Sequence, residues 1–383
     1  MLFASALTCF VFSVKYGSLF SLSRKTNAAL GRELSVLLEK IDKYYIGEHD
    51  SGELSAAAMH AAVDALGDRW SYYMTPEEYA EYLNSAGNQF AGIGVSVVIN
   101  EDAGGMEVMY IYKGSPAEKA GIEAGDIIIG IDGEKLAGMS LDEMREFLAR
   151  PIGETADIEL LRLRGITQTI QVVYDRVFTS PISYEMLDND IGYIRIGNFD
   201  GGAADGFIDA AGLLLKQGAK AFVFDVRSNG GGSVNEMTRI LDYLLPEGEI
   251  FISTDKSGHE NIITSDPDMV DIPAVVIVNR YSFSAAEYFA ETLREYGYAE
   301  IVGEQTTGKS RSQITEPLPG GGALHISSGQ YITKNRVDLY ETGGLTPDYP
   351  LVLSDEEFIV YMSGNLDLKD DPQLQLALSL LPY

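Results

Sequence analysis

The sequence contains a single cysteine, Cys9, so one chain can form neither a disulfide nor a thiolate metal cluster. Histidine is also scarce. The histidines are scattered along the chain, and none shows the spacing of a metal-binding motif. They are His49, His60, His259 and His325. We therefore expect neither a metal nor a cofactor.

Basic residues are few beside acidic ones. The chain has 28 lysines and arginines against 57 aspartates and glutamates, which gives a formal net charge of -29. Nucleic acids and anionic membrane surfaces are bound through basic patches. The charge therefore argues against a nucleic-acid partner, and we expect a solvated acidic surface. With 383 residues, of which 45% are hydrophobic, the chain can form two or three domains with a sizeable core.

Charge is also sparse at the N-terminus, where residues 1–14 carry none and Lys15 is the first charged residue. An uncharged run of this length is short for a membrane span and typical of the apolar part of a signal peptide. The basic residues expected before such a run are missing; a buried N-terminal helix is the alternative. We expect residues 1–24 to be a signal peptide or membrane anchor, and the protein to act outside the cytoplasm, secreted or membrane-anchored.

Residues 25–88 are predicted to form a helical N-terminal region. Leu30, Leu34 and Leu37 belong to an apolar stripe that recurs at helical spacing. Such a stripe could join two copies in a homo-oligomer. We expect it to pack onto its own chain, because that is the commoner arrangement.

Glycine turns and β-branched strands dominate residues 89–176. Residues 114–117 (Gly-Ser-Pro-Ala) and 120–126 lead into an apolar strand, and Ser140 with Glu143 predicts the capped start of a helix. This ordered set of motifs resembles a PDZ domain, a β-sandwich or barrel-like fold. The resemblance implies a domain that binds the free C-terminal end of another chain.

The expected carboxylate-binding loop lies at the head of this block. PDZ domains add the chain end as a strand and hold its carboxylate with backbone N–H groups. The groove would lie between strand 95–99 and helix 141–148. The alternative is that the glycines only make a turn. The expected binding residues are Gly92, Ile93, Gly94 and Val95.

Strands and helices alternate over residues 177–353. The segments 221–226 and 273–278 are short apolar strands of the kind that is buried on both faces of a sheet. This alternation predicts an α/β domain. Residues 354–383 read as a helical or loose C-terminal tail, so the whole chain is expected to be an α+β multidomain protein.

Ser284 follows the second of these strands and begins a predicted helix. With Glu287 it forms a capping-box pattern, so a serine here needs no catalytic reason. The position also exposes the hydroxyl at the positive end of the helix dipole, which favours a developing negative charge. A serine becomes a good nucleophile when a neighbouring base removes its proton, and a lysine can be that base if burial lowers its pKa.

Lys309 and Gln313 complete the pattern, although a lysine in a glycine-containing loop is usually solvated. Together with Ser284 and residues 225–232 (Asp-Val-Arg-Ser-Asn-Gly-Gly-Gly), they resemble the catalytic set of the carboxyl-terminal processing peptidases. These are serine–lysine proteases with a PDZ domain, of the tail-specific protease type. The resemblance covers nearly all of the chain after Lys25.

This resemblance implies a serine-peptidase domain of the crotonase/ClpP-like type and gives each residue a role. Ser284 would attack a peptide carbonyl, Lys309 would take its proton and Gln313 would orient the lysine amine. The PDZ domain would assist cleavage near the C-terminus of exported, unfolded or C-terminally exposed proteins. The family commonly has Ser-Ala-Ser-Ala-Ser-Glu at the nucleophile turn, whereas Phe283 and Ala286 here replace an alanine and a serine, which bears on substrate preference.

The resemblance also implies an oxyanion hole made by backbone N–H groups, with Asp225 and Arg227 supporting the loop that supplies one of them. The expected donors are Gly231 or Gly232 together with Ala285. A phosphate-binding Walker loop is the alternative for these glycines, but the lysine that it needs does not follow them.

Two other functional interpretations remain. A Ser-His-Asp triad would need His259 or His325 as its base, yet neither histidine lies in a motif. A non-catalytic PDZ scaffold that binds exported chain ends would need no base at all, and Lys309 with Gln313 argues against it.

Overall fold

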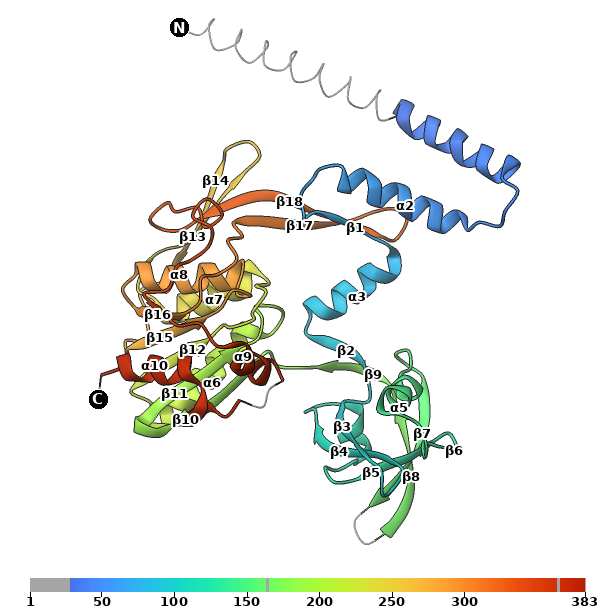
Figure 1. The fold of residues 1–383 in the computed structure, drawn as a ribbon, viewed down its shortest axis with the longest axis horizontal. Helices are drawn as coiled ribbons and strands as arrows, with labels where there is room; N and C mark the ends of the chain where they lie inside the picture. Colours follow the sequence, from blue (N-terminus) through green and yellow to red (C-terminus); the bar gives the residue numbers. More distant parts are fainter. Residues whose placement is uncertain (1–27, 163–164, 364–365, 383) are drawn as a thin grey trace, which may run out of the picture. The chain divides into compact units, whose positions relative to one another are not determined.

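The computed structural model describes residues 28–162, 165–363 and 366–382 (Figure 1). The chain divides into two compact units. One contains the residues up to Thr75 and Glu316–His325, and the other contains Pro76–Thr315 with the residues from Ile326 onward. The predicted signal peptide or anchor at 1–24 lies outside the described residues.

The first unit is mainly helical, as the sequence predicts. A helix spans residues 28–44. Asp50 caps the start of α2 (Ser51–Asp64), and its carboxylate accepts hydrogen bonds from two N–H groups of the first turn. Strand β1 (Tyr72–Met74) pairs with residues 323–325. The leucine stripe differs from expectation. Leu30 and Leu37 are 65% and 52% exposed, because no described residue of the chain covers this face.

The predicted PDZ block forms a sheet with the strand order β3-β4-β5-β7-β8, in which β6 pairs with β5. Its core is formed by fully buried side chains that include Met106, Ile128 and Ile158. The predicted capping box at Ser140 and Glu143 is present. The elements are β3 (Val95–Asn100), β4 (Gly105–Ile111), α4 (Pro116–Ala120), β5 (Ile127–Ile131), β6 (Glu134–Lys135), α5 (Leu141–Leu148), β7 (Thr155–Arg162) and β8 (Ile166–Val173).

Two chain segments lead into and out of this block. They are α3 (Pro76–Ala86) with β2 (Gln89–Gly92) on the way in, and β9 (Asp175–Phe178) on the way out. Strands β2 and β9 pair with each other as an antiparallel ribbon. Gly92, the first residue of the expected carboxylate loop, is the last residue of β2 and lies opposite Asp175.

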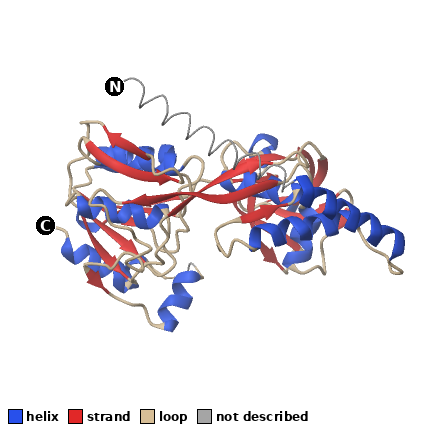
Figure 2. Ribbon diagram, turned by 90° about the horizontal axis from the view of Figure 1, so that it is seen from above, coloured by secondary structure: helices blue, strands red, loops and turns tan. Residues whose placement is uncertain are grey.

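A mixed sheet with the strand order β10-β11-β12-β15-β16-β19 forms the centre of the α/β region. Strand β10 is antiparallel to β11, and the other pairs are parallel. Figure 2 distinguishes the strands and helices by colour. The strands are β10 (Ile182–Leu187), β11 (Ile191–Ile196), β12 (Ala221–Asp225), β15 (Ala274–Val278), β16 (Ala299–Gly303) and β19 (Tyr349–Pro350).

Both faces of this sheet are covered, which explains its continuous apolar runs. Side chains alternate along a strand, so Phe222 and Phe224 of β12 join one hydrophobic cluster while Val223 joins another. The first cluster includes α6 (Ala203–Gln217), α7 (Val234–Leu244) and α8 (Ala285–Glu295). The second includes α10 (Pro372–Leu380).

A second sheet with the order β1-β18-β13-β14 carries β17 as an additional partner of β18. Its further strands are β13 (Gly248–Asp255), β14 (Glu260–Ser265), β17 (Arg311–Pro317) and β18 (Ala323–Ile332). Strand β18 contains Tyr331, whose hydroxyl lies 3.3 Å from Ser284 Oγ, and β17 contains Gln313.

The residues after 354 form α9 (Asp355–Met362), the 3-10 helix η3 (Leu368–Asp370) and α10. They are tied to the domain through Arg227, whose guanidinium lies 2.6 Å from both Asp225 and Asp371. Burial opposes ionisation of Asp225, but Arg227 outweighs it and keeps the pKa of that carboxyl below its usual value. All three side chains are at most 2% exposed. Asp371, at the start of α10, is therefore joined to the core through Arg227.

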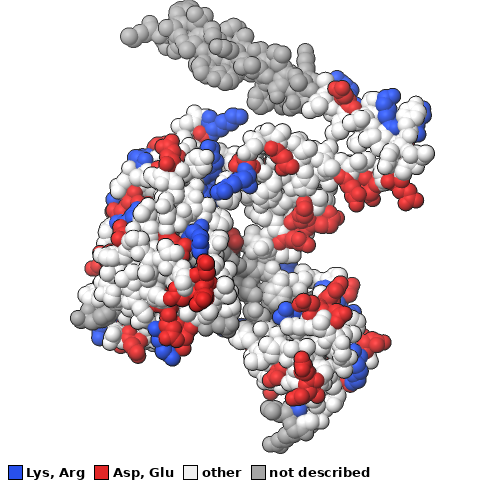
Figure 3. Space-filling model, viewed as in Figure 1, with Lys and Arg blue, Asp and Glu red and all other residues white. Residues whose placement is uncertain are grey.

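Acidic and basic side chains are both spread over the visible face, with no broad basic patch on it (Figure 3). Among the described residues, no helix combines the length and the apolar character needed to span a bilayer.

The Arg227 cluster generates a stability prediction. Asp371→Asn keeps an oxygen to cap α10 but removes one of the two carboxylates that compensate a buried guanidinium. We expect the free energy of unfolding to fall by about 2–3 kcal/mol in urea denaturation. The control is Lys220→Ala, which removes an exposed ion pair with Asp190 and should cost at most about 1 kcal/mol. Equal effects of the two variants would contradict the anchoring role.

Candidate active site

Ser284 lies in the turn that connects β15 to α8, at the carboxyl edge of the central sheet, and it is the N-cap of α8. Its backbone has φ 59° and ψ -122°. A non-glycine residue rarely adopts such a conformation, and strain of this kind is concentrated at functional sites. The turn therefore holds the serine in a geometry that its own backbone preference does not explain.

Glu287 connects the nucleophile turn to the lysine loop. Its side chain is fully buried. It accepts hydrogen bonds from the backbone N–H groups of Ser284 at 2.9 Å, Gly308 at 2.6 Å and Lys309 at 2.9 Å, and another from the Thr306 hydroxyl. Burial raises the pKa of Glu287, and these donors oppose the rise. One carboxylate thus fixes both segments of the expected catalytic pair.

Lys309 lies in the loop between β16 and β17 and is only 9% exposed, which departs from the usual solvated lysine. Its ammonium nitrogen is 5.9 Å from the centre of the Phe283 ring. Its carbonyl oxygen accepts a hydrogen bond from the Tyr331 hydroxyl, and that hydroxyl is also 3.3 Å from Ser284 Oγ. Tyr331 therefore links Ser284 to the backbone of Lys309.

Gln313 lies on β17 and is partly buried. Its side-chain amide donates hydrogen bonds to the Arg311 carbonyl at 2.9 Å and to Ser327 Oγ at 3.1 Å. These bonds place the amide in a defined orientation on the second sheet, on the strand that follows the Lys309 loop.

The glycine loop after β12 packs directly against the nucleophile turn. A Cβ atom added to Gly231 would lie 2.8 Å from Ser284 Cβ and 3.0 Å from the Ala285 nitrogen, so only glycine fits there. The Gly231 N–H already donates to Asn229 Oδ1 at 2.8 Å. Over the described stretches, the N–H groups of Gly230, Gly232 and Ala285 donate to no protein acceptor.

His259 and His325, the candidate bases of the competing triad, have their own contacts in the structure. His259 is exposed, and its backbone N–H donates to Asp255 at 3.0 Å. The His325 ring stacks on Tyr72 with 4.7 Å between the ring centres. In the described parts of the chain, no group of three His, Cys, Asp or Glu side chains is arranged to hold a metal ion.

A groove of about 300 Å³ lies at the expected carboxylate loop. Gly94 has φ 81°, and a Cβ atom there would lie 2.3 Å from Ser115 Cβ, so the close turn requires glycine. The backbone N–H groups of Ile93 and Gly94 donate to no acceptor within the described residues. Two adjacent unused donors at the end of a groove can bind an anion.

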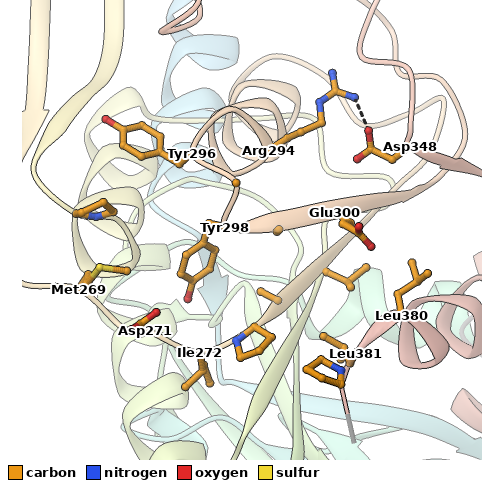
Figure 4. A pocket seen from close by; sticks show the side chains of 17 residues that line it. Met269, Asp271, Ile272, Arg294, Tyr296, Tyr298, Glu300, Asp348, Leu380 and Leu381 are labelled. Atoms are coloured by element: carbon orange, nitrogen blue, oxygen red, sulfur yellow. Dashed lines mark hydrogen bonds and ion pairs between the residues drawn. The ribbon is translucent and has the colours of Figure 1, made fainter.

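A separate hollow of about 790 Å³ lies at the amino ends of β15 and β16 (Figure 4). Arg294 and Asp348 form a 3.4 Å ion pair on its wall. Ser284 follows the carboxyl end of β15, the edge at which α/β sheets usually bind ligands. This hollow is therefore distinct from the candidate active site.

Sequence reasoning missed two side chains of the site. It interpreted Glu287 only as a helix cap, because the reach of that carboxylate to Gly308 and Lys309 depends on tertiary structure. Tyr331 has no local signal, since it lies on β18, far from Ser284 in the chain. The one signal in the sequence is the position of Glu287, three residues after Ser284 and between the apolar residues of a helix, which could have indicated a role beyond capping the helix.

Two family profiles match regions of this chain. The peptidase family S41 profile matches residues 190–351, and a PDZ domain profile matches residues 107–162. The chain is 31% identical to a carboxyl-terminal-processing protease of Picosynechococcus sp., over 82% of this chain and 76% of the relative. It is 28% identical to the carboxy-terminal processing protease CtpA of Bacillus subtilis, over 96% of this chain and 78% of the relative.

Two solved structures share the fold. An S41 protease from Bacteroides fragilis superposes with a TM-score of 0.52 at 17% identity, covering 88% of this chain and 92% of that one. The tricorn protease gives a TM-score of 0.50 at 19% identity, covering 79% of this chain and 31% of that one. At these identities the likeness shows the fold alone, whereas the sequence relatives show the family. The chain belongs to peptidase family S41 and is a serine peptidase of the carboxyl-terminal processing protease type.

Proposed function

We propose that Ser284 and Lys309 form the catalytic dyad of this peptidase, with Gln313 orienting the lysine amine. The observation that carries the proposal is the Glu287 carboxylate, which binds the backbone of both Ser284 and Lys309. A purely structural cap at a helix start needs only the first of these bonds. The low exposure of Lys309 adds support, because a lysine must be desolvated to act as a base near neutral pH.

The reaction then follows from these groups. Neutral Lys309 takes the proton of Ser284 Oγ as that oxygen attacks the peptide carbonyl, and the tetrahedral oxyanion accepts hydrogen bonds from backbone N–H groups. Since the Gly231 N–H is engaged by Asn229, we assign this role to Ala285 with Gly230 or Gly232. Protonated Lys309 gives its proton to the leaving amine, and water then hydrolyses the acyl-enzyme with Lys309 again as the base.

The mechanism requires the Lys309 amine and Ser284 Oγ to lie within hydrogen-bond distance when the substrate is bound. The Lys309 ammonium nitrogen lies above the Phe283 ring, and catalytic hydrogen bonds often tighten only when the substrate binds. The Tyr331 hydroxyl has one proton, which it donates to the Lys309 carbonyl. The same hydroxyl also lies 3.3 Å from Ser284 Oγ, so Tyr331 can hold the serine side chain in place before the substrate binds.

Lys309→Arg should be nearly as inactive as Lys309→Ala and Ser284→Ala, because a guanidinium stays protonated. We expect each variant to cleave an unfolded protein about 10³-fold more slowly than wild type, or worse. Circular dichroism controls for folding. Substantial activity of the arginine variant would reassign the base. A wild type as inert as Ser284→Ala, even with a partner added, would favour the non-catalytic PDZ scaffold.

We further propose that the PDZ groove delivers substrates by their free C-terminal ends. The unused N–H groups of Ile93 and Gly94 support this role, as does the edge position of β3, which leaves one side open for an added strand. The Ile93 side chain is 2% exposed and belongs to the domain core, so a charged residue there would disturb folding. The exposed Ala149, which lines the groove, is the better place for a change.

Peptides with a free, apolar C-terminus should be cleaved about tenfold faster than their amidated counterparts, because amidation removes the charge that the loop binds. Ala149→Glu should abolish this difference by repelling the carboxylate, while Ser284 still reacts with a small acylating probe. Parallel assays of the two peptides provide the measurement. Equal cleavage of both by wild type would refute chain-end reading.

We also propose that the protein acts outside the cytoplasm, as the composition of residues 1–24 predicts. Some relatives are named as chloroplastic enzymes, including carboxyl-terminal-processing peptidase 1 of Arabidopsis thaliana. Fractionation of cells that express the full gene should recover the protein in the membrane or extracytoplasmic fraction. Recovery of intact protein in the cytosol would argue against export. Homo-oligomerisation stays a prediction.

A further inference from the structure

The PDZ groove contains a charged side chain that chain-end binding alone does not require. Its lining is formed by the loop around Gly92, by the start of β3, by Phe90 and Tyr112, and by the end of α5. Arg145 is the one Lys or Arg among these lining residues. A groove for an apolar chain end needs no cation at this place, because the terminal carboxylate is bound by backbone N–H groups.

The Arg145 guanidinium is available to a ligand. The side chain is 56% exposed, and its ion pair with Asp142 is long at 3.8 Å. Asp142 is itself 96% exposed, so the pair is weak and easily exchanged for another carboxylate. Glu143 and Glu146 on the same helix do not line the groove.

The position of Arg145 along the groove selects one ligand residue. It precedes Leu148 by one turn of α5, a rise of about 4.5 Å, and both side chains line the groove. On a strand added beside β3, side chains that point the same way repeat about every 7 Å. If the terminal side chain packs beside Leu148, the next one on that face belongs to the third residue from the end. It would lie about 7 Å along the groove, which the long side chain of Arg145, about 4.5 Å along, can reach.

We propose that Arg145 makes the PDZ groove selective for chain ends with an acidic side chain at the third position from the C-terminus. The inference rests on the proposed chain-end reading and adds a substrate class to it. An aspartate or glutamate there would pair with the guanidinium at the open side of the groove, whereas a lysine would be repelled. The overall negative charge of the protein would otherwise disfavour acidic ligands.

The test measures binding by fluorescence anisotropy to the full chain carrying Ser284→Ala, which prevents cleavage. The labelled peptides end in Ala-Asp-Ala-Val or Ala-Lys-Ala-Val, each as free acid and as amide. At low salt the aspartate free acid should bind about 3- to 5-fold more tightly than the lysine free acid, and the difference should shrink at high salt. Adding Arg145→Ala should remove the preference, and Arg145→Glu should reverse it.

Lys119→Glu is the matched control, because it makes the same charge change on α4, outside the groove lining. It should preserve the preference. Two failures are distinguishable. If free acids and amides bind equally, chain-end reading fails and the inference fails with it. If free acids are preferred but aspartate and lysine peptides bind alike, or if Lys119→Glu acts as Arg145→Glu does, only the role of Arg145 is overturned.

Discussion

The geometry of the candidate active site depends on the hydrogen bonds of the buried Glu287 carboxylate. This carboxylate binds one N–H at the nucleophile turn and two in the lysine loop, so neither segment can shift without breaking a charge-assisted hydrogen bond in a dry environment. Burial raises the pKa of Glu287 against these donors. One buried side chain therefore holds the turn at Ser284 and the loop at Lys309 in a fixed position relative to each other.

The sequence predicted the parts of the molecule that depend on local pattern. The strand predicted at 221–226 is apparent from the apolar run Ala-Phe-Val-Phe and is observed at Ala221–Asp225, and the Ser140–Glu143 cap is a local motif that the structure confirms. The leucine stripe before Gly47 shows the limit of such reasoning. Periodicity predicted the helix at 28–44 but not what covers it, because burial depends on partners that helical spacing does not specify.

The candidate site likewise contains residues that the sequence predicts and residues that only the structure shows. Ser284, Lys309 and Gln313 can be recognised in the sequence from their spacing. The contact between Tyr331 and Ser284 cannot, because it joins residues 47 positions apart that only the tertiary fold brings together. The glycine loop is another case. All three glycines look equivalent in sequence, but Asn229 occupies the N–H of Gly231 and thereby distinguishes it from its neighbours. Hydrogen-bond competition of this kind is decided by distances of a few ångströms, which no pattern records.

The strained backbone conformation of Ser284 has an evolutionary consequence. At φ 59° and ψ -122° the residue occupies a region where glycine is at ease and other residues are strained. Backbone strain would therefore favour glycine at this position, and the proposed nucleophilic role of the hydroxyl would account for the serine. A descendant that lost its proteolytic role would gain by the replacement. If Ser284 is the nucleophile, as we propose, glycine at the corresponding position of a relative would indicate a protein without this catalytic activity.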